Sequence, residues 1–173
     1  MGKITTISGP MYAGKTTKLI EMYHKEQDES KIVIKPKIDT RYSISHVVSH
    51  NKEMINAESI NSIEELIQKT EKIKHLFIDE IQFFDLEIAK VLCKMAVDGK
   101  KIYVSGLNFD FRGNPFETVK FMLEHSDNIE MLEGECAKCN NTSSYTFRTN
   151  SSDKLVLIAV SYTHLTLPTK RIV

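Results

Sequence analysis

The stretch that decides the fold lies near the amino terminus and reads Gly9-Pro10-Met11-Tyr12-Ala13-Gly14-Lys15-Thr16. It matches the pattern GxxxxGK[ST], in which a glycine-rich loop wraps its backbone N–H groups around phosphates and leads into a helix. The run Ile4–Ser8 before it is typical of a buried strand, and Leu19 and Ile20 lie on one face of a helix predicted over 15–25. An ordinary glycine turn that caps a helix is the alternative. The strand and the helix on either side favour the phosphate loop.

The rest of the chain alternates between strand and helix patterns. Strand-like runs occur at 31–35, 75–78, 101–105 and 128–132, and helical periodicity occurs at 62–70, 86–97 and 115–124. The polar stretch 36–51 has turn chemistry and favours a loop or a ragged hairpin. Repeated strand and helix units predict an α/β fold of the P-loop NTPase-like (RecA-like) type, with a mainly parallel sheet flanked by helices.

The composition excludes several classes of protein. Among 173 residues, 23 Lys and Arg balance 23 Asp and Glu, and 41% of the residues are hydrophobic. Bulk charge therefore does not favour a nucleic-acid partner, and no apolar run reaches the roughly 20 residues that span a bilayer. The amino terminus lacks the apolar block of a secretory signal. We expect a cytoplasmic protein that binds neither nucleic acid nor membrane.

Two carboxylates end the third predicted strand, in the stretch Phe77-Ile78-Asp79-Glu80. The ligand crevice of an open α/β sheet lies at the carboxyl ends of its strands. With a phosphate loop upstream, Lys15 is predicted to reach the β and γ phosphates, and Thr16 and Asp79 to support Mg²⁺. Glu80 is then placed to accept a proton from an attacking hydroxyl or water. The alternative is a solvated turn that happens to carry two acids.

Two further loops follow predicted strands. The loop 106–116 carries Phe109, Phe111 and Phe116, and an aromatic ring at a strand end can stack on a planar base. The alternative is that these rings fill the core beneath the loop. The charged stretch 35–42 either adds charge beside the phosphates or forms a solvated loop.

The three cysteines do not form one set. Cys136 and Cys139 have the CxxC spacing of a zinc knuckle, but they supply only two of the four ligands of a structural zinc site. A thioredoxin-type redox motif is disfavoured, because it opens a helix after the first strand of its domain. Cys93 lies in an apolar helical pattern, so we expect it in the core.

Taken together, these segments resemble the type II thymidine kinases. The blocks that carry the resemblance span residues 1–159 in order: GPMYAGKT, KPKIDTRY, the Ser-His pair at 49–50, FIDEIQFF, GLNFDFRGNPF and CAKC. The resemblance implies transfer of the γ-phosphoryl group of ATP to the 5′-hydroxyl of thymidine, with Glu80 as general base. It also implies Mg²⁺ with ATP, a structural Zn²⁺ and a cytoplasmic homotetramer.

The resemblance also implies roles for individual residues. The ATP-binding residues would be Gly9, Pro10, Met11, Tyr12, Ala13, Gly14, Lys15, Thr16, Asp79, Glu80, Ile81 and Gln82. Asp39 and Arg41 would lie beside the phosphates, and Phe111 would pack on the thymine ring. The thymidine pocket as a whole would be lined by Met11, Phe83, Leu107, Phe111 and Phe116.

The chain departs from the family pattern at two points. Asn108 stands where the family has Asp, which removes a charge but keeps a hydrogen-bonding side chain. After Ala159 the second cysteine pair of the family is missing, so Cys136 and Cys139 are expected to bind zinc weakly or not at all.

We therefore expect three parts: a kinase core over 1–133, a partial zinc and lid segment over 134–160, and a non-native tail over 161–173. The alternatives to an active thymidine kinase are an inactive fragment that binds nucleotide and a P-loop ATPase of another class.

Overall fold

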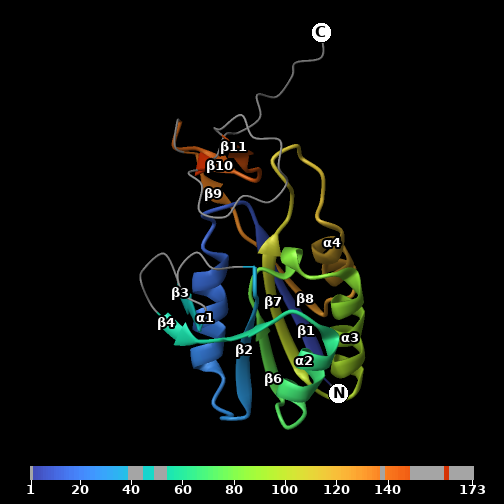
Figure 1. Cartoon of the computed structure of the whole chain (residues 1–173). Coiled ribbons are helices and arrows are strands. Elements are labelled where there is room, and N and C mark those ends of the chain that lie inside the picture. Colours follow the sequence, from blue (N-terminus) through green and yellow to red (C-terminus); the bar gives the residue numbers. More distant parts are fainter. Residues whose placement is uncertain (1, 39–44, 49–53, 137–138, 149–161, 164–173) are drawn as a thin grey trace.

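The fold was analysed in a computed structural model of the whole chain (Figure 1). The structure describes residues 2–38, 45–48, 54–136, 139–148 and 162–163. Within them, no helix is long and apolar enough to cross a membrane. The central sheet consists of β1 (Lys3–Gly9), β2 (Lys31–Pro36), β5 (Glu58–Ile60), β6 (His75–Ile78), β7 (Lys101–Leu107) and β8 (Asn128–Met131).

Helices and short strand pairs complete the described part of the chain. The helices are α1 (Lys15–Lys25), α2 (Ile63–Thr70), α3 (Leu86–Val97) and α4 (Glu117–Glu124), with the 3-10 helix η1 (Ile81–Phe83). The antiparallel pairs are β3 (His46–Val48) with β4 (Met54–Asn56), β9 (Gly134–Glu135) with β10 (Thr142–Ser143), and β11 (Phe147–Arg148) with β12 (Tyr162–Thr163).

The six-stranded sheet is parallel throughout, which confirms the predicted α/β class. Its strand order is β5-β2-β6-β7-β1-β8, and every neighbouring pair runs in the same direction. The carboxyl ends of all six strands therefore meet at one edge of the sheet. The phosphate loop follows β1, Asp79 and Glu80 follow β6, and the aromatic loop follows β7, so all three are brought to this edge.

Helices cover both faces of the sheet. Figure 1 shows α1 on one side and α2, α3 and α4 on the other. Side chains alternate along the strands accordingly: Phe77 packs in the cluster with Leu19 of α1, whereas Leu76 and Ile78 pack in the cluster with Leu92 of α3. Fully burying each such side chain stabilises the fold by about 1.5–3 kcal/mol. The two apolar layers fix the sheet and thereby the loops at its carboxyl edge.

The predicted helices and strands that the structure describes lie within two residues of the predicted limits. The helix expected from residue 115 begins at Glu117, because Phe109 forms a β-bridge with Pro115 and holds the chain extended there. Strand β5 was not predicted, since three residues carry too little alternation to be recognised. Within the stretch 36–51, residues 46–48 form β3, which pairs with β4 beyond the stretch, and residues 39–44 and 49–51 lie outside the described residues.

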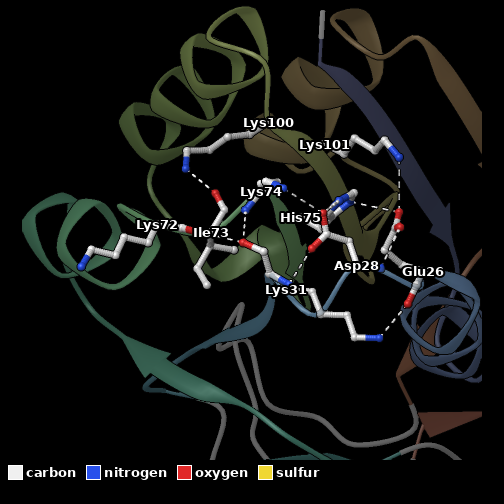
Figure 2. Close-up of polar contacts among 10 residues, drawn as sticks. Glu26, Asp28, Lys31, Lys72, Ile73, Lys74, His75, Lys100 and Lys101 are labelled. Carbon is white, nitrogen blue, oxygen red and sulfur yellow. Dashed lines mark hydrogen bonds and ion pairs between the residues drawn. The ribbon is translucent and has the colours of Figure 1, made fainter.

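A cluster of ionisable side chains lies at the opposite edge of the sheet, where the strands begin (Figure 2). His75 is buried at the start of β6, with Nδ1 3.0 Å from Oε2 of Glu26 and Nε2 3.5 Å from Oδ2 of Asp28. Lys101 lies 3.4 Å from the Glu26 carboxylate, and Lys74 lies 3.2 Å from that of Asp28. This amino-edge ion cluster joins the end of α1 to the first residues of β6 and β7.

The charges of this cluster favour ionised carboxylates. A backbone hydrogen bond from Ser30, with help from Lys74, lowers the pKa of Asp28. Burial raises the pKa of Glu26, but the hydrogen bond from the Asp28 backbone and the charges of His75 and Lys101 together bring it below its ordinary value. Both carboxylates are thus better accommodated as anions in the folded state.

Candidate active site

The loop between β1 and α1 has the geometry of a phosphate-binding site. Gly14 adopts a left-handed conformation with φ 80° immediately before the first residue of α1, and Tyr12 does so with φ 60°. The Lys15 side chain is buried, and its Nζ donates to the carbonyl oxygen of Pro10 at 2.5 Å. The ammonium group therefore lies over the loop at the positive end of the helix dipole. Both charges favour an anion at this position.

Asp79 lies at the end of β6, opposite the first turn of α1. The residue is 4% exposed, and the Thr16 hydroxyl lies 3.2 Å from Oδ2 of its carboxylate. Its backbone N–H donates to the carbonyl of Ile34 on β2 at 2.9 Å, which fixes the strand end. Carboxylate and hydroxyl oxygens are the hard ligands that Mg²⁺ prefers, directly or through water. Thr16 and Asp79 therefore fit the metal that accompanies ATP.

A second hydroxyl reaches the same carboxylate from the neighbouring strand. Ser105 of β7 is 1% exposed, and its Oγ donates to Oδ1 of Asp79. Ser105 was not predicted, because a serine near the end of a strand carries no signal of its own. Only the parallel register of β6 and β7, in which Ile78 pairs with Val104, places Ser105 beside Asp79.

Glu80 is held in an unusual backbone conformation. Its φ of 54° and ψ of 45° lie in the left-handed region, which costs a residue other than glycine about 1–3 kcal/mol. The Gln82 amide donates to the Glu80 carboxylate, and its Oε1 accepts a hydrogen bond from the N–H of Leu107 at 3.1 Å. The carboxylate is thus half-buried at the sheet edge and tied to the end of β7.

Gly106 is needed for η1 to pack against β7. A Cβ at this position would lie 2.7 Å from Cγ2 of Ile81 and 3.0 Å from Oε1 of Gln82. Both distances are shorter than normal packing allows, so only glycine leaves room for Gln82 to reach the Leu107 N–H.

The aromatic loop after β7 is shaped by a carboxylate that was not predicted. Asp110 is buried and accepts hydrogen bonds from the backbone N–H groups of Arg112 at 2.8 Å and Asn114 at 2.9 Å. The guanidinium of Arg112 lies 5.1 Å from the ring centre of the half-buried Phe111. Phe116 packs against the core cluster that includes α3 and α4, as the core alternative for this ring expected.

The segment from β10 onward contacts the same edge of the sheet. Thr146 is buried, and its Oγ1 accepts a hydrogen bond from the N–H of Met11 in the phosphate loop at 2.9 Å. Tyr145 stacks on Phe109, with ring centres 5.0 Å apart and an interplanar angle of 22°. We refer to residues 144–146 as the clasp. Figure 1 shows the strands around it beyond the carboxyl edge of the sheet.

Asn108 completes the attachment of the clasp. Its Oδ1 accepts from the N–H of Phe109 at 2.9 Å, which leaves Nδ2 to donate to the carbonyl of Ser144 at 3.1 Å. An ionised aspartate has no hydrogen to donate to that carbonyl. An aspartate at position 108 would therefore not make this hydrogen bond to the clasp.

Backbone hydrogen bonds join Cys136 to the residues that follow Cys139. The N–H of Asn140 donates to the carbonyl of Cys136, and the N–H of Cys136 donates to the carbonyl of Asn141, both at 2.8 Å. Cys136 is buried and Cys139 is exposed. Among the residues that the structure describes, no group of three or more Cys, His, Asp or Glu is arranged to hold a metal. These residues therefore do not make a closed zinc site by themselves.

The remaining sequence predictions have mixed outcomes. Cys93 packs against the core as expected, and burial raises the pKa of its thiol. Phe83 lies in η1, directly after the acidic pair. Asp39 and Arg41 lie outside the described residues, as do Ser49 and His50 and most of 149–173.

The chain was compared with known proteins. The sequence profile of the family described as "Thymidine kinase" matches residues 2–167. A thymidine kinase of Bacteroides thetaiotaomicron is 36% identical over 159 residues, which cover 91% of this chain and 80% of that protein. The chain belongs to the thymidine kinase family, whose members are ATP-dependent phosphotransferases.

Proposed function

We propose that the carboxyl edge of the sheet is where this kinase transfers the γ-phosphoryl group of ATP to the 5′-hydroxyl of thymidine. The observation that carries the proposal is the convergence of three groups on this edge. They are the phosphate loop with Lys15, the pair Thr16 and Asp79, and the Glu80 carboxylate held by Gln82. Phosphoryl transfer depends on positioning and on charge stabilisation, and these groups supply both.

The phosphates of ATP would be bound by the loop 9–16. Its backbone N–H groups and Lys15 provide the positive charge, and the helix dipole of α1 adds to it. Thr16 and Asp79 would hold the metal, and Mg²⁺ so bound would neutralise charge on the β and γ phosphates. Lys15 already lies over the loop, so little rearrangement is needed to meet the phosphates.

Glu80 would act as general base. Its carboxylate is half-buried at the strand end, and the Gln82 amide orients one of its oxygens. The other oxygen can accept the proton of the 5′-hydroxyl as that oxygen attacks the γ phosphorus. Gln82 also bonds to Leu107, a residue of the proposed nucleoside pocket, and so links the base to the substrate's position.

The thymidine pocket would be lined by Met11, Phe83, Leu107, Phe111 and Phe116. Phe111 would pack on the thymine ring, a stacking contact worth about 1–3 kcal/mol by analogy with base stacking on aromatic side chains. Thr146 and Asn108 support this pocket because they attach the clasp to Met11 and to the aromatic loop. Within 134–160, the clasp is the part whose contacts support a lid over the nucleoside.

Self-association into a homotetramer is proposed from the family. One feature of the described residues supports association: Ile129 and Met131 on the edge strand β8 are 50% and 54% exposed. An edge strand with exposed apolar side chains favours pairing with another chain. A structural Zn²⁺ is not part of the proposal, since the described residues supply only half of a ligand set.

Thymidine-dependent formation of ADP tests the proposed function. Purified protein is incubated with Mg²⁺-ATP with and without thymidine, and ADP and thymidylate are measured. We expect equal amounts of both products, and a loss of roughly 10²–10⁴-fold in kcat for Glu80→Gln with ATP binding retained. ADP formation that is the same without thymidine would support an ATPase of another class. ATP binding without turnover would support an inactive fragment.

A further inference from the structure

The carboxylate of Asp79 is buried between the end of the sheet and the first turn of α1. Asp79 is 4% exposed and Ser105 is 1% exposed. They directly follow Ile78 and Val104, which pair between β6 and β7. The Ser105 hydroxyl donates to Oδ1, while the Thr16 hydroxyl approaches Oδ2 at 3.2 Å. Ser105 thus bonds Oδ1 from the sheet side, and the Thr16 hydroxyl on the helix side lies nearer to Oδ2 than to Oδ1, which it approaches at 3.4 Å.

A buried carboxylate needs hydrogen-bond donors, because desolvation without them is costly. Thr16 belongs to the phosphate loop, and its oxygen is itself a candidate metal ligand. Ser105 lies in β7, where it pairs with Ile7 of β1, and the preceding residue Val104 pairs with Ile78 of β6. It can therefore hold Oδ1 in one orientation whether or not nucleotide is bound.

We propose that Ser105 is a positioning residue for the Mg²⁺ of the ATP complex. By fixing Oδ1 of Asp79, it aims Oδ2 at the metal or at a metal-bound water beside Thr16. The inference rests on the proposed role of Asp79. Outer groups that orient a metal ligand typically change metal affinity about 10–100-fold when removed. The hydroxyl of Ser105 is such a group.

The test separates metal binding from nucleotide binding. A fluorescent ATP analogue is titrated into the enzyme in excess Mg²⁺ and again in EDTA, and the ratio of the two Kd values gives the gain due to the metal. For Ser105→Ala we expect this gain to fall by about tenfold or more, with the affinity in EDTA unchanged. In steady-state assays the concentration of Mg²⁺ needed for half-maximal rate should rise correspondingly. Ser105→Thr keeps the hydroxyl and is expected to keep most of the gain.

Ser8→Ala provides the matched control. Ser8 is a fully buried serine on the neighbouring strand β1, and its hydroxyl donates to the carbonyl of Gly106 at 3.2 Å rather than to a carboxylate. Ser8→Ala should lower the free energy of unfolding as Ser105→Ala does, but it should leave the gain in ATP affinity due to Mg²⁺ unchanged. Equal losses in Ser8→Ala and Ser105→Ala would show a merely structural role and overturn the inference.

Asp79→Asn distinguishes failure of the inference from failure of the proposed function. If Asp79→Asn loses the gain due to Mg²⁺ and Ser105→Ala keeps it, the positioning role of Ser105 is wrong while the role of Asp79 stands. If Asp79→Asn itself keeps the full gain, the proposed metal site is wrong and the inference falls with it. Loss in both variants, with the gain unchanged in Ser8→Ala, supports the inference.

Discussion

Around Asp79, the groups that hold the carboxylate come from β7 and from the start of α1, and the strand end is bonded to β2. The clasp at residues 144–146 reaches the same edge in another way. It is attached by the hydroxyl of Thr146, the ring of Tyr145 and the carbonyl of Ser144, and it belongs to no strand of the central sheet. Tyr145 is 36% exposed, whereas Asp79 is 4% exposed.

This difference concerns the two halves of the proposed site: the phosphate half around Asp79 and the phosphate loop, and the nucleoside half around the aromatic loop and the clasp. Groups inside a parallel sheet are fixed by many neighbours, so the proposed phosphate half is suited to chemistry that needs exact positions. The clasp contacts both the phosphate loop and the aromatic loop, which in the proposed function bind ATP and thymidine. Changes in one half should therefore alter ATP parameters, and changes in the other should alter thymidine parameters.

Among the variants that compare the two halves, the largest expected effect is on the phosphate side. Lys15→Ala removes the buried ammonium over the loop and should lower kcat/KM for ATP by about 10²–10³-fold, as loss of a charge-stabilising donor does. Lys18→Ala is the control, since this lysine lies one turn further along α1 and pairs with Glu130 at 3.0 Å on the surface. Steady-state kinetics with varied ATP measure both. A similar loss in the two variants would contradict a specific role for Lys15.

The next effect is on the nucleoside side. Phe111→Ala removes the ring proposed to pack on thymine and should raise the KM for thymidine by about 5- to 150-fold, the equivalent of 1–3 kcal/mol. The KM for ATP should stay the same. Phe111→Leu keeps apolar area without a ring, so its KM for thymidine should lie between those of the unchanged protein and Phe111→Ala. An equal rise in both KM values would mean that the two halves do not separate as proposed.

A smaller effect is expected from loosening the clasp. Thr146→Val keeps the shape but removes the acceptor of the Met11 N–H, a hydrogen bond worth about 0.5–1.5 kcal/mol. The KM for thymidine should rise about two- to tenfold by the same energy scale. Thr142→Val changes an exposed threonine in β10 and should have no effect. If Thr146→Val changes only the KM for ATP, the clasp serves the phosphate half instead.

The smallest effect concerns stability at the opposite edge. Folding lowers the pKa values of Glu26 and Asp28 from their ordinary 4.5 and 3.8, so their contribution is complete above those values and is lost as pH falls through the folded ones. The melting temperature should therefore drop below about pH 4.5, less steeply in Glu26→Gln. Thermal unfolding between pH 3 and 7 measures this. If the melting temperatures of the unchanged protein and of Glu26→Gln fell in parallel with pH, the prediction for Glu26 would be wrong.

Much of the phosphate half was predictable from the sequence. The helices 15–25 and 86–97 and the strand 75–78 have the predicted limits, because their apolar periodicity is complete within each segment. Gly9–Thr16 is one contiguous motif with its own mechanism, and Asp79 and Glu80 end a recognisable strand. Local signals of this kind do not depend on which elements become neighbours in space.

The missed residues act through distant partners. Ser105 bonds to Asp79, which is 26 positions away in the sequence, and Thr146 bonds to Met11, which is 135 positions away. Serine and threonine occur throughout the chain, so nothing in their own neighbourhood marks these two. Asp110 was missed for a different reason, since it orders its own loop by backbone hydrogen bonds that become apparent only once the turn is formed.

The sequence by itself determined the α/β class, the phosphate loop and the pair of acids, because each depends on a short pattern of residue types. Only the tertiary structure decided how the Asp79 carboxylate is oriented, which residue holds Glu80 and what fastens the clasp. Those features depend on the register of the parallel strands and on hydrogen bonds between buried groups that are far apart in the sequence. Close packing of the sheet brings these donors and acceptors together.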